Sequence, residues 1–262
     1  MKYSILGVLV NNTNLSGATE MILTAARQRQ PLAVSALAVH GVMTGVLDPE
    51  HLYRLNHIDL VVADGQPVRW ALNLLYKAGL GHRVYGPTLM DWTLNFAEKQ
   101  GLSVYFYGST QPVLNRMCCK LRQKFPNLRI AGSQPSRFGP LTAESADQIA
   151  AQIRASGAHM VFVGLGCPRQ EVWAFEFRER LGMPIIAVGA AFPFSAGLLK
   201  QAPAWMQNSG MEWFFRLCTE PRRLWRRYLL LSPAYLFLVL CQHLGIEFQS
   251  VGQQPTQEIL HG

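Results

Sequence analysis

The sequence predicts an α/β fold built on a mainly parallel sheet and followed by a helical, membrane-binding appendage. Three observations predict it. The chain has 262 residues, 49% of them hydrophobic, which is enough to bury one sizeable core. Short continuous apolar runs alternate with longer amphipathic segments, as in βαβ units. Near residue 206 the composition changes, because aromatic and basic side chains become frequent beyond it.

Six apolar runs have the length of strands and are expected to form the sheet, since parallel strands buried on both faces read as continuous hydrophobic segments. They are residues 32–38, 60–63, 103–107, 128–132, 160–164 and 185–188. The intervals between them contain helix-like segments at residues 87–100, 111–125, 143–155 and 169–180. The apolar start ends at polar residues 11–14 without a small-residue cleavage site, which favours a first strand and turn over a signal peptide. We therefore expect an α/β catalytic domain at 1–206.

Four polar or glycine-rich loops follow directly on predicted strands, at residues 64–67, 108–110, 164–171 and 189–191. In open parallel sheets ligands bind beyond the carboxyl ends of the strands, often where the strand order reverses. The sequence therefore predicts a ligand cleft at this edge. The glycines expected to contact the ligand are Gly108, Gly164, Gly166 and Gly189.

Asp64 is the carboxylate that we expect to do chemistry. It ends an apolar strand and precedes Gly65, where a strand-to-helix loop can present a side chain into a cleft. A carboxylate beside an acceptor hydroxyl can remove its proton as the oxygen attacks an anomeric carbon. The alternative is that Asp64 caps the helix that begins near Pro67.

The loop from Gly164 to Glu171 is the second candidate. Its two glycines allow close backbone approach, and N–H groups at the start of the next helix can meet a phosphate. Gln170 is expected to bond a uracil or a sugar hydroxyl. The third glycine of the dinucleotide fingerprint is absent. An ordinary tight turn with a capped helix is the alternative.

Arg83 is a candidate phosphate contact, with a surface ion pair as its alternative.

The net charge of +8 and the pI near 9.5 indicate an anionic partner. The densest basic run precedes an apolar stretch at 229–240, and no nucleic-acid motif is present, so a membrane surface fits better than nucleic acid. Twelve apolar residues broken by Ser232-Pro233 are too few to span a bilayer. They suit an interfacial helix within an appendage at 207–248, or else a helix packed on the core or in an oligomer interface. The arginines expected to bind a diphosphate or acidic headgroups are Arg216, Arg222, Arg223 and Arg226.

Four further features of the sequence bear on the cellular compartment and on the need for a metal or cofactor. The polar residues 249–262 are expected to form a disordered tail. Five cysteines give neither a zinc pattern nor a disulfide framework, which indicates a reducing cytoplasm. Neither a DxD nor an HExxH motif occurs, so we expect no metal and no cofactor. His40 lies among apolar residues, which favours a core or supporting role over a ligand role.

Taken together, these motifs resemble the WecG/TagA/CpsF family of bacterial glycosyltransferases, which includes N-acetylmannosaminyl transferases of teichoic acid and enterobacterial common antigen assembly. The similarity runs from Ile5 to about Tyr228. The segments that carry it are residues 64–67, 83–87, 163–171, 212–217, 220–224 and 226–228.

The resemblance implies a metal-independent, inverting transferase with a Rossmann-like core, often called the GT-E fold. It implies a UDP-sugar donor, a polyprenyl-diphosphate-linked sugar acceptor, and an appendage that closes over the active site at the cytoplasmic membrane surface. By the same resemblance, the general base falls on Asp64 and the donor-site glutamine on Gln170. Ser35 stands where the family has an active-site threonine.

Four positions depart from the family pattern, namely Leu37, Thr88, Pro193 and Gln201. The proposed base is unaffected, but the donor sugar is open between N-acetylmannosamine and another hexose. A membrane-associated scaffold derived from a transferase is the non-enzymatic alternative. The enzymatic alternative is a nucleotide-dependent oxidoreductase. The absence of the third glycine of the dinucleotide fingerprint disfavours it. A homo-oligomer is also compatible with the sequence.

Overall fold

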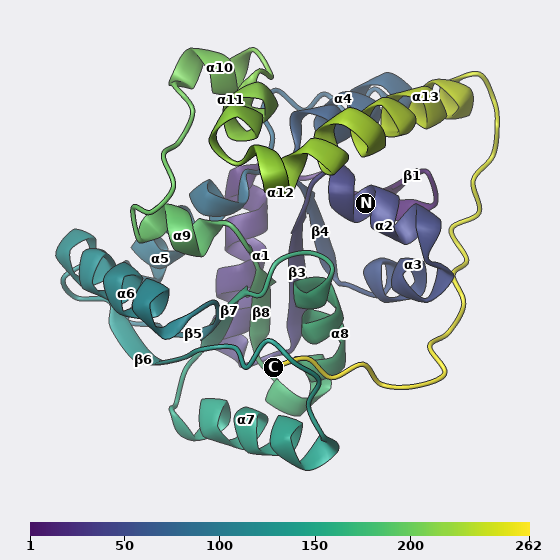
Figure 1. Ribbon diagram of the computed structural model, residues 1–262. Coiled ribbons are helices and arrows are strands. Elements are labelled where there is room, and N and C mark those ends of the chain that lie inside the picture. The colour runs from purple at the N-terminus through teal and green to yellow at the C-terminus, as the bar shows by residue number, and fades with distance from the viewer.

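A six-stranded parallel sheet forms the centre of the computed structural model, which describes residues 1–262 apart from the side chains of Ala204 and Asn208 (Figure 1). The strand order is β4-β3-β8-β7-β5-β6, and every pairing in it is parallel. The strands are β3 Leu32–Leu37, β4 Leu60–Ala63, β5 Ser103–Gly108, β6 Arg129–Gln134, β7 Met160–Gly164 and β8 Pro184–Ala187. This confirms the predicted Rossmann-like sheet, with strand bounds within two residues of those expected.

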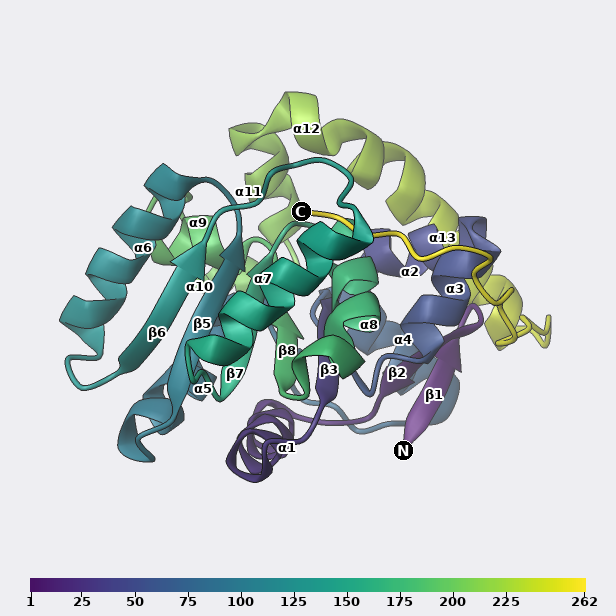
Figure 2. The ribbon, with the colours of Figure 1, turned by 90° about the horizontal axis from the view of Figure 1, so that it is seen from below.

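Helices cover both faces of the sheet, and each face has its own apolar core. The helices of the α/β part are α1 Leu15–Gln28, α2 Val39–Leu47, α3 Pro49–Asn56, α4 Gln66–Tyr76, α5 Gly86–Lys99, α6 Gln111–Lys124, α7 Ala143–Ala155, α8 Arg169–Leu181 and α9 Ala191–Ser195. Along β5, Tyr105 and Tyr107 enter one core while Val104 and Phe106 enter the other, because successive strand side chains point to opposite faces. In Figure 2, α8 and α1 accordingly lie on opposite sides of the sheet.

The N-terminal residues form an antiparallel hairpin of β1 Lys2–Ile5 and β2 Val8–Asn11, separate from the main sheet. Its turn places Leu6 and Gly7 at positive φ, 52° and 89°. The Asn11 side chain accepts a hydrogen bond from the Val61 backbone N–H at 2.9 Å, which attaches the hairpin to β4. The apolar start is thus a structural element of the core.

The predicted appendage, residues 207–248, begins within α10 Ala204–Asn208. It continues with α11 Glu212–Thr219, α12 Pro221–Arg226, the π-helical turn η1 Arg227–Leu231 and α13 Ser232–His243. The helix continues without a break from Pro221 to His243, 23 residues that by length and composition could cross a membrane. The prediction that Ser232-Pro233 interrupts the helix is therefore wrong. A π turn just before Pro233 allows the helix to continue, and the Ser232 hydroxyl donates to the Arg227 carbonyl at 3.2 Å.

The last residues, 249–262, run along α3 and α8 and end beside α7 (Figures 1 and 2). Gln253 N–H donates to the Pro49 carbonyl at 3.0 Å, and Leu260 joins the core on the α7–α8 face. This placement differs from the disordered tail that the polar composition predicts. The reason is tertiary: the segment satisfies its backbone groups with side chains and carbonyls that the folded core supplies.

Candidate functional site

Two adjoining cavities open at the carboxyl edge of the sheet. The first, of about 470 Å³, lies between α4 and the appendage, and we call it the appendage cavity. The second, of about 300 Å³, lies over the loops that follow β5, β7 and β8, and we call it the loop cavity. Both are lined by Ala38, His40, Asp64, Tyr85, Arg216 and Arg227. The cavities therefore meet at a group of residues drawn from both the core and the appendage.

The two cavities differ in chemistry. The appendage cavity is bounded by Trp70, Trp213 and Leu236, with Pro67 and Leu224 among its other apolar contacts. The loop cavity is bounded instead by backbone-rich segments, which are the Gly164–Cys167 loop, Ser109, and Gly189-Ala190. An apolar or amphipathic group suits the first, and an anionic group that accepts N–H bonds suits the second.

Asp64 lies where the cavities meet. Its Oδ1 accepts a hydrogen bond from the Gly86 N–H at 2.6 Å, and its own N–H donates to the Leu37 carbonyl at 3.0 Å. The residue at the N-cap of α4 is Gly65, so the Asp64 side chain bonds the first residue of α5 instead of capping α4. Burial raises the pKa of Asp64, while Arg83 and the Gly86 N–H act in the opposite direction. A carboxylate with a raised pKa at a cavity junction is suited to take up a proton.

Arg83 connects this loop to the appendage. Its Nη1 donates to the Asp64 carbonyl at 3.3 Å, and its Nη2 forms an ion pair with Glu212 of α11. The Tyr85 hydroxyl donates to Glu212 Oε1 at 3.1 Å, and the Arg83 guanidinium stacks over the Tyr85 ring at 4.2 Å. The arginine predicted to contact a phosphate is thus held by a carboxylate. We call Arg83, Tyr85 and Glu212 the polar joint.

The arginines of the appendage separate into two groups. Arg216 lines both cavities and lies over the Phe194 ring at 5.9 Å, and Arg223 lines the loop cavity. Arg223 is exposed and pairs with Glu220 at 2.6 Å. Arg222 and Arg226 line neither of the two cavities, and Arg226 stacks on Trp225 at 5.3 Å. Arg227 belongs to the predicted basic run but not to the predicted site residues, and it lines both cavities. The helical period could have found it, since residues 223 and 227 are four apart and share a face.

The predicted glycines allow the strand-end loops to pack closely. A Cβ on Gly108, which has φ +107°, would lie 2.9 Å from the Gly164 backbone, and one on Gly164 would lie 2.5 Å from the Phe192 ring. A Cβ on Gly189 would lie 2.7 Å from Gln170 Oε1. Gly166 has φ +80° and lines the loop cavity, with open space where its Cβ would be. Three of these glycines thus serve packing, and Gly166 leaves room for a ligand.

Gln170 and Ser35 are buried and bonded within the protein. Gln170 Oε1 accepts from the Gly166 N–H at 3.2 Å, and its Nε2 donates to Glu171 Oε1 at 2.8 Å. The Ser35 hydroxyl donates to the same Glu171 oxygen at 3.1 Å. Gln170 still lines the loop cavity. Ser35 lines neither cavity, so its role here is to hold the loop in shape through Glu171, a role that Gln170 shares.

Glu171 is fully buried, and sequence reasoning gave it no role. Burial raises its pKa to about 7, against the hydrogen bonds from Gln170 and Ser35. Its Oε2 has no hydrogen-bond partner among the described residues. The only signal in the sequence was its place at the end of the Gly164–Glu171 motif. A carboxyl in this position links β3, α8 and the loop cavity.

His40 follows β3 and lines both cavities. Burial, assisted by the positive charge of Arg227, lowers its pKa to about 4. The imidazole is therefore neutral at neutral pH and can donate or accept one hydrogen bond at the junction without adding charge.

A comparison with protein families agrees with this geometry. The model of the glycosyl transferase WecG/TagA/CpsF family matches residues 3–248, which include the sheet, both cavities and the whole appendage. The family implies a sugar donor and an acceptor as substrates. The chain belongs to the WecG/TagA/CpsF family of glycosyltransferases.

Proposed function

We propose that this glycosyltransferase moves one sugar from a UDP-sugar to a polyprenyl-diphosphate-linked sugar, with inversion and without a metal ion, during surface polysaccharide assembly. We further propose that it works at the cytoplasmic face of the membrane as a peripheral protein. The observation that carries the proposal is the position of Asp64, which lines two cavities of different chemistry. A base placed where the two substrates meet can take the proton from an acceptor hydroxyl as that oxygen attacks the donor.

The loop cavity suits the donor. Backbone N–H groups of the glycine-rich loops and the guanidinium groups of Arg216, Arg223 and Arg227 favour a diphosphate. Their charge would stabilise UDP as it leaves, since positioned cations act on the negative charge that develops in the transition state. Neutralisation of the diphosphate by these cations supports the proposal of a transfer without a metal.

The appendage cavity suits the acceptor. Its aromatic and aliphatic walls end at α13, whose Leu236 lines it. An acceptor anchored in the bilayer would extend its sugar toward Asp64, with the first part of the lipid along these walls. The exposed apolar face of α13 and its neighbours fits a helix that lies against the membrane.

The reaction follows from this arrangement. Asp64 removes the proton from the acceptor hydroxyl as that oxygen attacks the anomeric carbon of the donor. The bond from that carbon to the UDP oxygen breaks, UDP carries away the bonding electrons, and attack opposite to the leaving group inverts the configuration. The donor sugar is N-acetylmannosamine or another hexose.

The test is UDP release from a panel of UDP-sugars, with and without a short-chain prenyl-diphosphate-sugar acceptor, in the presence of EDTA. Acceptor-dependent release from one donor would support the proposal and identify the sugar. Release abolished by EDTA and restored by a divalent cation would contradict metal independence. No release from any donor by folded protein would favour the scaffold alternative.

A further inference from the structure

The C-terminal tail lies outside the part of the chain that matches the family, which ends at residue 248. We call residues 249–262 the strap. It begins just after the membrane-facing helix α13 and ends beside the loop between β6 and α7 (Figure 1). Neither the chemistry nor the membrane contact proposed above gives these residues a role. The contacts of the strap with the core indicate one.

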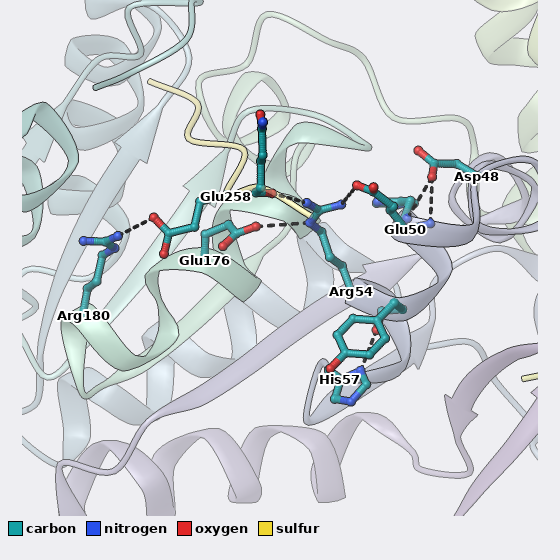
Figure 3. A network of polar contacts seen from close by, with 10 residues as sticks. Asp48, Glu50, Arg54, His57, Glu176, Arg180 and Glu258 are labelled. Atoms are coloured by element: carbon teal, nitrogen blue, oxygen red, sulfur yellow. Dashed lines mark hydrogen bonds and ion pairs between the residues drawn. The ribbon is translucent and has the colours of Figure 1, made fainter. Parts of the chain in front are cut away.

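The middle of the strap is fixed to the core by a buried cation. Arg54 on α3 is 1% exposed, and it pairs with Glu176 of α8 at 3.2 Å. Its Nη2 donates to the Gln257 carbonyl of the strap at 3.2 Å. Next to it, Arg180 pairs with Glu258 at 2.8 Å (Figure 3). A buried guanidinium needs several acceptors, so the strap carbonyl completes its shell and is held firmly.

The end of the strap is fixed to the loop between β6 and α7. Leu141 N–H donates to the Leu260 carbonyl and Gly262 N–H donates to the Gly139 carbonyl, both at 2.9 Å. The Ser136 hydroxyl donates to the Gly262 carbonyl. Leu260 itself is 8% exposed and packs in the core. The strap therefore acts on residues 136–141 like an added strand.

This loop borders the loop cavity. The Ser136 N–H donates to the carbonyl of Ser109, which lines that cavity. Phe138 also lines it, with half of its surface exposed and with φ +56°. A bulky residue at positive φ is unfavourable unless its surroundings hold it there. The Phe138 N–H donates to Ser136 Oγ at 2.9 Å, the same hydroxyl that bonds the strap.

We propose that the strap orders residues 136–141 so that Phe138 forms a wall of the nucleotide part of the donor cavity. The strap would thereby act as a positioning element for donor binding. The proposal rests on the function proposed above, because it takes the loop cavity as the donor site. An exposed aromatic ring beside a phosphate-binding loop is suited to stack on a base.

The test compares full-length variants by UDP affinity in calorimetry and by amide hydrogen exchange of residues 136–141. Leu260→Asp detaches the end of the strap, and Ile259→Asp is its matched control, since Ile259 is 38% exposed. Ser136→Ala removes the shared hydroxyl with little risk to folding. Phe138→Ala removes the wall, and Phe138→Tyr keeps a ring in place.

We expect Leu260→Asp, Ser136→Ala and Phe138→Ala to weaken UDP binding about fivefold to a hundredfold, the range for loss of one base–aromatic stack. Leu260→Asp and Ser136→Ala should also speed exchange in the loop, while Ile259→Asp and Phe138→Tyr stay within about twofold of the wild type. The KM for the acceptor should not change.

Faster exchange with unchanged UDP affinity would overturn the inference and leave the proposed function intact. Unchanged exchange in both Leu260→Asp and Ser136→Ala would show that the strap does not order the loop, and would also overturn it. A wild-type protein that fails to bind UDP would overturn the donor assignment itself, which is a different result from equal binding by all variants.

Discussion

The α/β core and the appendage treat their apolar side chains in opposite ways. The core buries them in two clusters, one on each face of the sheet. In the appendage, large side chains remain exposed along α11 to α13, among them Trp213, Phe214, Trp225, Leu229, Phe237 and Leu240. Exposed apolar side chains gathered in one part of a chain favour a surface that binds a membrane, a protein or a ligand. The core is therefore stabilised by its own packing, whereas the exposed apolar face of the appendage fits the proposed contact with a membrane.

Both polar and apolar contacts join the core to the appendage. The polar joint of Arg83, Tyr85 and Glu212 attaches α11 to the core next to Asp64. Tyr235 and Val239 of α13 add apolar contacts to the core. The site thus lies between a core that buries its apolar side chains and an appendage that leaves many of them exposed.

The largest effect should come from the core side of the junction. We expect Asp64→Asn to lower turnover about 10²- to 10⁴-fold, the usual contribution of a general base, while UDP affinity stays close to that of the wild type. The measurement is acceptor-dependent UDP release beside calorimetry. Asp91→Asn, at an exposed ion pair with Lys124, is the control. Turnover near the wild-type value in Asp64→Asn would remove the base assignment.

The next effect concerns stability of the core. The pKa of Glu171 is about 7 in the fold and 4.5 as the ordinary value, so the folded state binds more protons between these pH values. Wild-type stability should therefore fall as the pH rises from 4.5 through 7, by up to about 3 kcal/mol. Glu171→Gln, which has no charge to bury, should lose less over that range.

Urea unfolding at pH 5 and pH 8 measures this difference. Glu179→Gln is a suitable control, because Glu179 is exposed on the same helix. Equal pH dependence of Glu171→Gln and the wild type would mean that Glu171 does not titrate in the fold.

A third, smaller effect should appear when the joint is weakened. Glu212→Gln keeps the shape but removes the charge that pairs with Arg83. Charged hydrogen bonds contribute about 1.5–3 kcal/mol, so we expect kcat/KM to fall about tenfold or more. Core stability should change little, because the sheet does not depend on α11. Glu20→Gln at an exposed pair with Arg27 should be silent. Activity of Glu212→Gln equal to that of the wild type would show that the joint does not position the appendage.

The smallest effect should be on the membrane side. Phe237 is 65% exposed on α13, and burying such a ring in a bilayer contributes about 1.5–3 kcal/mol when complete. Phe237→Ala should weaken binding to anionic vesicles about tenfold in a sedimentation assay. Met21→Ala, at an exposed apolar position on α1 of the core, should bind as the wild type does. Equal binding by both variants would contradict a membrane role for this face.

The sequence by itself determined the class of fold and most of its elements. Continuous apolar runs such as 103–107 and 160–164 are buried on both faces, so their pattern does not depend on which strands become neighbours. Asp64 and the glycine-rich loops could be placed at one edge for the same reason, because parallel strands end together.

Tertiary structure decided the partners of these groups. Glu212 and Arg227 reach the site from an appendage more than a hundred residues away from Asp64 in the chain, and no local pattern encodes that contact. Gln170 and Ser35 bond Glu171 instead of projecting freely, because their neighbours exist only once β3 and α8 pack together. The helix through Pro233 and the strap at 249–262 were missed for a related reason. By local pattern alone, Pro233 predicts a helix break and a polar tail predicts disorder. In the folded chain, a π turn before Pro233 lets the helix continue, and buried Arg54 binds a carbonyl of the tail.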